Sequence, residues 1–291
     1  MADRPDPLVI AGEVRLARGR RRLRSMLARL IAISLLASLA GACGTLPNGR
    51  AWGEDATATP GWRHVRDAAW QAARSPRVWV PLAAAALLQI NGWDREIADW
   101  AREETPLFGS VENAGRWSDD LRTASVVAFH VATLATPGGD TPREWIPNKL
   151  RGFAVDAAAI VSTTALTQGL KSAAGRERPN GADHESFPSG HTAVAAVHGR
   201  LAAINLRSID LRPGTRRLLD VGIDAITIGT SWARIEAGWH YPSDTLVSAS
   251  LGAFFASFHS DAFLGLDRAL APTIAPGLTA DGASLQFRWA F

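Results

Sequence analysis

Three short stretches of the chain place cationic, hydroxyl, imidazole and carboxylate side chains near the ends of predicted helices. They are "KSAAGRERP" with Lys171 and Arg178, "FPSGHTAV" with Ser189, Gly190 and His191, and "RIEAGWHYPSD" with Arg234, His240 and Asp244. Guanidinium and ammonium groups bind phosphate oxygens, and burying them beside apolar helices is costly unless an anion is present. If folding brings the stretches together, they predict a site for a tetrahedral oxyanion.

The second stretch predicts a helix that begins beside this anion. Ser189 is a natural N-cap, and the unpaired N–H groups of the first turn attract negative charge. Gly190 has no side chain to obstruct an approaching oxygen. Taken alone, the stretch is equally consistent with an ordinary helix cap that contains a histidine.

The two histidines have properties suited to acid–base and nucleophilic roles. Asp244 follows His240 by four residues, and a carboxylate beside an imidazole fixes its tautomer. An imidazole held in this way can attack phosphorus, and His191 can then protonate the leaving oxygen. Considered singly, His191 is interpreted as a capping histidine, and His240 with Asp244 as a structural pair. Considered together, the three residues favour a catalytic role.

The order and spacing of these residues resemble a known family. Lys171 and Arg178-Pro179 are separated by six residues, Pro-Ser-Gly-His follows, and Arg234, His240 and Asp244 are separated by five and three residues. This pattern is similar to the three-part signature of the type 2 phosphatidic acid phosphatase superfamily, which includes bacterial acid phosphatases, lipid phosphate phosphatases and vanadium haloperoxidases. The resemblance covers about residues 171 to 244. Ala233 departs from it, because many relatives have serine there.

The resemblance implies a helical bundle that hydrolyses a phosphomonoester or pyrophosphate, with a lipid-linked substrate plausible, without metal or cofactor and through a phosphohistidine. It implies that His240 is the nucleophile, Asp244 its partner and His191 the general acid. The implied phosphate ligands are Lys171, Arg178, Ser189, Gly190 and Arg234. Two alternatives stay open: a haloperoxidase that binds vanadate at His240, and a non-catalytic lipoprotein that binds anionic lipid.

The hydrophobic pattern predicts an all-α fold of six to eight helices, with at most a short C-terminal strand at "SLQFRWAF". Helical segments are expected at about 63–75, 94–104, 121–135, 149–171, 189–206, 214–235 and 243–260, and residues 78–91 form an apolar segment. Charged residues interrupt the apolar segments, which favours the buried helices of a water-soluble bundle over membrane spans. The tryptophans are expected in the core, with a face against lipid headgroups as the alternative.

The N-terminus predicts export. Residues 1–42 contain eight arginines and three acidic residues, so the rest of the chain is net negative and a nucleic-acid partner is not expected. An arginine-rich run precedes an apolar run that ends in "LAGAC", which resembles a lipobox and predicts lipidation of Cys43. We therefore expect a leader at 1–42, a tether at 43–62 and a phosphatase domain at 63–291. The expected protein is periplasmic and membrane-anchored, and an integral membrane protein is the alternative.

Overall fold

The computed structural model describes residues 44–46 and 49–265, and the backbone of 273–279 and 282–288. The predicted leader and the lipidation site Cys43 lie outside the described residues. The helices of the described part are α2 Trp62–Arg74, α3 Pro76–Leu87, α4 Trp93–Glu104, α5 Val111–Ala135, α6 Pro142–Ala174, α7 Gly190–Leu206, α8 Pro213–Glu236 and α9 Pro242–His259. A short 3₁₀ turn at Ile90–Gly92 precedes α4, and a π-turn at Ser260–Leu264 follows α9.

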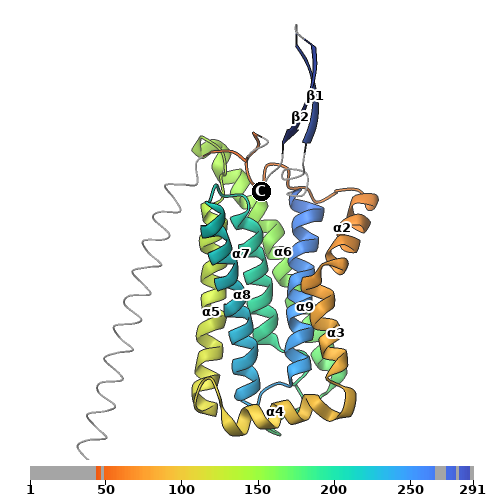
Figure 1. Ribbon diagram of the computed structural model, residues 1–291, viewed down its shortest axis with the longest axis vertical. Helices are drawn as coiled ribbons and strands as arrows, with labels where there is room; N and C mark the ends of the chain where they lie inside the picture. Colours follow the sequence, from red (N-terminus) through yellow and green to blue (C-terminus); the bar gives the residue numbers. More distant parts are fainter. Residues whose placement is uncertain (1–43, 47–48, 266–272, 280–281, 289–291) are drawn as a thin grey trace, which may run out of the picture.

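The described residues confirm the all-α prediction, because these eight α-helices make up the body of the fold. The predicted C-terminal strand is β2, Gly282–Arg288. It pairs antiparallel with β1, Thr273–Thr279, which the sequence analysis did not predict. This hairpin is a two-stranded sheet outside the helical bundle, and in Figure 1 it stands beyond one end of the helices.

Helix boundaries follow from capping residues in the sequence. The side chains of Ser110, Thr141 and Ser189 each accept a hydrogen bond from a backbone N–H in the first turn of α5, α6 and α7. Such caps satisfy N–H groups that have no partner within the helix. Helix α6 ends at Gly175, whose φ of 54° lies in the left-handed region that glycine tolerates.

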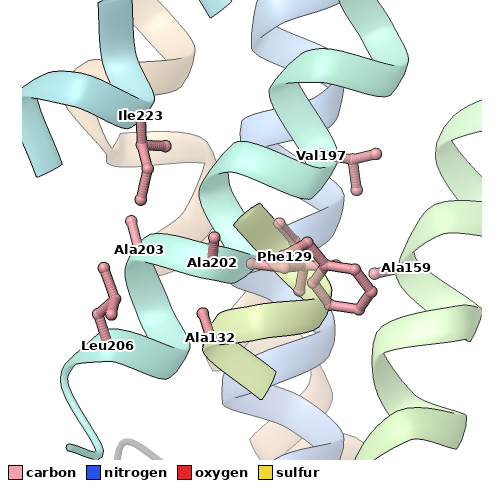
Figure 2. Packing of buried hydrophobic residues seen from close by; sticks show 10 residues of the cluster. Phe129, Ala132, Ala159, Val197, Ala202, Ala203, Leu206 and Ile223 are labelled. Carbon is pink, nitrogen blue, oxygen red and sulfur yellow. The ribbon is translucent and has the colours of Figure 1, made fainter. Parts of the chain in front are cut away.

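Helix α7 is the central helix and packs against α5, α6, α8 and α9. Small side chains allow the close approach, as Figure 2 shows where Phe129 of α5 lies among Ala132, Ala159 and Ala202. At Gly252 of α9, an added Cβ would lie 2.6 Å from the backbone nitrogen of Val197, so a larger residue would force the two helices apart.

A buried lysine joins two helices at the end of the bundle remote from the predicted site. Lys149 of α6 is 3% exposed, and its Nζ donates to the carbonyl oxygens of Thr133 at 2.7 Å and Thr136 at 2.6 Å. These carbonyls end α5, where the helix leaves acceptors unpaired. Burial lowers the pKa of Lys149 to about 7, with Asp156 acting in the opposite direction.

The prediction that tryptophans form the core is wrong for most of those described. Trp52 is fully buried. Six of the described tryptophans are between 46% and 77% exposed, namely Trp62, Trp70, Trp79, Trp93, Trp100 and Trp117. Among the described helices, α6 is long and apolar enough to cross a membrane, and only 28% of its most apolar window is buried in the bundle. The outer face of the bundle is therefore more apolar than the sequence analysis expected.

The predicted site residues gather at one end of the bundle. In Figure 1, α4 crosses the end at which α7 and α9 begin and α8 ends, opposite the β-hairpin. The helix expected at 94–104 is α4, and its residues Asp94, Ala98 and Ala101 are buried. Helix α4 is amphipathic and closes this end of the bundle with one face.

Candidate active site

His240 is buried between α8 and α9 and is held in one tautomer. Its ring is 2% exposed, and Nδ1 donates a hydrogen bond to the carbonyl oxygen of Ser186 at 2.5 Å. A carbonyl oxygen can only accept, so the proton lies on Nδ1 and Nε2 carries the lone pair. Burial holds the pKa of His240 well below its usual value, and Arg234 lowers it further. His240 is therefore a neutral imidazole with an available nitrogen.

Asp244 reaches His240 through Ser186 and not by a direct hydrogen bond. Its carboxylate is 4.0 Å from His240 Nδ1, beyond hydrogen-bond distance. It accepts from the Ser186 hydroxyl at 2.6 Å and from the backbone N–H of Tyr241 at 2.9 Å. The carboxylate thus fixes the residue whose carbonyl oxygen orients the ring. Sequence spacing alone suggested direct contact and gave no indication of Ser186.

Two further charged residues support this arrangement, the partly buried Arg176 and the buried Asp94, and the sequence analysis missed both. Arg176 donates to Asp244 at 2.7 Å and to Asp94 of α4 at 2.8 Å. Asp94 also accepts from the backbone N–H and the hydroxyl of Ser243, at 2.8 and 2.5 Å. This network ties α4 to the first turn of α9. An aspartate at the start of an amphipathic helix was the available signal, but it did not identify the partners.

Arg234 is buried without an acceptor. It is 8% exposed, and its Nε has no hydrogen-bond partner among the described residues. Burial lowers its pKa to about 10, and the nearby charge of Arg178 adds to the effect. An uncompensated buried cation is costly, so this guanidinium is prepared for an anion that binds from outside.

Lys171 and Arg178 surround the same imidazole, because both charges lower the pKa of His240. Both bind loop groups: Lys171 Nζ donates to the Glu185 carbonyl oxygen, and Arg178 Nε to Asp183 at 2.5 Å. The indole of Trp239 lies against two of the cations, 4.9 Å from the Arg178 guanidinium and 5.1 Å from that of Arg234. Trp239 is a further site residue that the sequence analysis did not single out.

Ser189 and Gly190 lie where α7 opens toward these cations. Ser189 is fully buried, and its hydroxyl accepts from the Thr192 N–H at 3.4 Å. A Cβ added to Gly190 would meet no atom within 4 Å, so the space in front of the first turn is open. The helix start thus has the room that an anion would need.

His191 lines a cavity of about 550 Å³, and His240 is not among the described residues that line it. Its Nε2 lies 2.8 Å from an oxygen of Asp119, a residue of α5 that the sequence analysis missed. One side of the cavity is formed by Arg234 and Trp239, and the other by Arg102 of α4 and by the first turns of α5. Within the residues that the structure describes, no group of three or more His, Cys, Asp or Glu side chains could hold a metal ion.

Comparison with known proteins agrees with this geometry. Residues 155–262 match the model of the PAP2 superfamily. The match covers 108 of the 291 residues of the chain. The matched range contains all eight predicted site residues.

The other comparisons add little to this assignment. Among solved structures, the chain is similar to the first transmembrane PAP2 type phosphatidylglycerolphosphate phosphatase from Bacillus subtilis, with a TM-score of 0.47 and 18% identity. That similarity covers 71% of this chain and 97% of the other. A comparison with curated proteins gives no match.

Proposed function

We propose that this PAP2-superfamily protein is a metal-independent phosphatase that acts through a phosphohistidine on His240. The observation that carries the proposal is the buried guanidinium of Arg234, whose Nε has no hydrogen-bond partner among the described residues, beside a neutral, buried His240. One group is prepared for a phosphate oxygen, and the other presents a nitrogen lone pair. A site that only bound an anion would gain nothing from a nucleophile kept neutral among cations.

In the first step, the Nε2 lone pair of His240 attacks phosphorus and the bond to the leaving oxygen breaks. His191 gives its proton to that oxygen. The charge on the other phosphate oxygens is stabilised by three cations, Lys171, Arg178 and Arg234. The N–H groups at the start of α7 contribute to the same stabilisation. The imidazole becomes positively charged, and the Ser186 carbonyl oxygen keeps its Nδ1 proton in place.

In the second step, water attacks the phosphorus of the phosphohistidine. His191, which lost its proton in the first step, takes one from this water. The nitrogen–phosphorus bond breaks, its electron pair returns to His240, and inorganic phosphate leaves. Asp244 and Ser186 hold the ring in the same orientation through both steps.

The substrate is a phosphomonoester or a pyrophosphate, and a lipid-linked one fits the surroundings of the cavity. Val111, which lines the cavity, is 42% exposed, and Leu107, four residues before it in the chain, is 70% exposed. Glu236 holds this segment by accepting from the backbone N–H groups of Leu107 and Phe108 at 2.9 and 3.0 Å. An acyl or prenyl chain would cover these side chains while the phosphate lies at His240.

Export and lipidation at Cys43 remain part of the proposal and are supported by the leader sequence. Mass spectrometry of the mature N-terminus tests them. The expected product begins at a diacylated Cys43, and an unmodified Met1 would refute the lipid anchor.

The phosphatase proposal is tested by phosphate release from an aryl phosphate. We expect activity that persists with a chelator, is inhibited by vanadate, and falls by at least about 1,000-fold in His240→Gln, because the nucleophile is lost. His130→Gln is the matched control, because His130 is exposed and bonds only to its own helix at Val126. Acid-labile phosphate trapped on the wild type and absent from His240→Gln would identify the intermediate. Chelator-sensitive turnover that is indifferent to His240 would exclude this mechanism.

A further inference from the structure

The general acid in this mechanism has a partner that no sequence motif indicates. Asp119 lies on α5, 72 positions before His191 in the chain, and its oxygen is 2.8 Å from His191 Nε2. The two side chains line the same cavity. Within the described residues, His191 Nδ1 has no hydrogen-bond partner, so the ring is held from one side only.

We propose that Asp119 is the positioning residue of the general acid, holding His191 through Nε2–H so that Nδ1 exchanges the proton with the leaving oxygen. The proposal rests on the phosphatase function proposed above. When Nδ1 gives its proton to the leaving oxygen, the ring becomes neutral and keeps Nε2–H on Asp119. Nδ1 is then correctly placed to take a proton from the attacking water.

The charges around His191 explain why such a partner is needed. An acid must carry its proton, but burial lowers the pKa of His191, and Arg234 of α8 and Arg122 of α5 lower it further. Asp119 is the group that opposes them, through its hydrogen bond and its charge. Arg122 is 3.9 Å from the same Asp119 oxygen and weakens that effect. Asp119 thus counters the burial and the two arginines that favour the neutral ring.

The position of Asp119 on α5 makes this contact part of the cavity wall. Glu112, Gly115, Arg116 and Asp119 line the cavity, and their spacing of three and four residues places them on one face of the helix. Glu112 and Arg116 pair with each other at 2.9 Å, which leaves Asp119 for His191. The Asp119 side chain is 61% exposed, so an ordinary surface ion pair of little energetic value is the competing interpretation.

The test compares substrates that differ only in their need for an acid. An aryl phosphate with a stable phenolate leaves without protonation, whereas an alkyl phosphate needs a proton on its alkoxide. In Asp119→Asn, we expect kcat for the alkyl phosphate to fall by about 10- to 100-fold, with a change of less than about 3-fold for the aryl phosphate. The basic limb of the alkyl profile should move about one pH unit lower, because His191 loses its proton more easily.

Asp120→Asn is the matched control, since it removes the same charge from the next residue, which is exposed and has no described contact. It should leave both substrates and the pH profile unchanged. Asp119→Glu should restore part of the alkyl activity. Equal losses on both substrates, or an Asp119→Asn profile identical to that of Asp120→Asn, would overturn the proposal.

Failure of the phosphatase proposal would be seen separately. If the wild type hydrolyses neither substrate, the proposed function fails. NMR titration of His191 then still tests the contact, because its pKa should fall in Asp119→Asn and stay unchanged in Asp120→Asn. An unchanged pKa in both variants would show that Asp119 does not act on the ring.

Discussion

Replacing Arg234 by methionine should make the ligand-free protein more stable while it removes activity. Burial and the neighbouring Arg178 lower the pKa of Arg234 to about 10. Each pKa unit corresponds to about 1.4 kcal/mol, so the charged guanidinium destabilises the empty fold by up to about 3 kcal/mol. Methionine fills similar space without a charge. We expect a gain of about 1 to 3 kcal/mol, or a rise of about 3 to 10 °C in Tm.

The same substitution should abolish the response to phosphate. A ligand that binds only the folded state raises Tm, so inorganic phosphate or vanadate should stabilise the wild type. Arg234→Met should show little of this stabilisation and should lose about 100- to 1,000-fold in kcat, as expected for one lost contact to the transition-state oxygens. Differential scanning fluorimetry with and without phosphate, together with phosphate release, measures both effects.

Arg200→Met is the control for the removal of a buried arginine. Burial likewise lowers the pKa of Arg200 to about 10, but its Nε donates to Ser257 at 3.0 Å and the charges around it lie outside the site. This variant should keep the phosphate-induced rise in Tm. The reasoning is refuted if Arg234→Met is less stable than the wild type and is still stabilised by phosphate to the same extent.

Three further outcomes follow from the geometry. The kcat/KM profile should peak at acidic pH. Activity falls above the pKa of His191, which must be protonated, and below the pKa of His240, which must be neutral. Both pKa values lie below the usual 6.5. Ser186→Ala removes the 2.6 Å bond to Asp244 and should lower kcat by about 10-fold while vanadate affinity is retained, as measured by inhibition. Lys149→Met removes the ammonium donor from the buried carbonyl oxygens of Thr133 and Thr136. It should lower the free energy of unfolding by about 2 to 4 kcal/mol in a denaturant titration, with kcat unchanged at low temperature.

The helices were largely predictable from local sequence, because each depends on residues close in the chain. Ser189 before a glycine and a run of small apolar residues predicts the start of α7, and Gly175 marks the end of α6. Helix α5 begins at Val111, ten residues before the predicted start at 121. Polar residues in its first turns, which line the cavity or face solvent, interrupted the apolar pattern there.

The surface was not predictable in the same way. A tryptophan carries no local signal that distinguishes a core position from an outer face, and Trp52 and Trp62 have opposite environments only ten residues apart. Burial depends on which helices pack on each side. That arrangement is set by contacts between helices distant in the chain, such as α3 with α9 and α5 with α7.

The residue types alone indicated which groups could bind a phosphate, since the spacing of Arg234, His240 and Asp244 is built into one helix end and the next helix start. The contacts that hold these groups depend on how the helices pack. The partner of His240 Nδ1 is a main-chain carbonyl, which every residue possesses and no side-chain pattern reveals. The partner of His191 comes from α5, and the packing of that helix against α7 brings Asp119 into contact. Spacing identifies groups that share one segment, whereas a contact between distant segments depends on the free energy of packing the whole bundle.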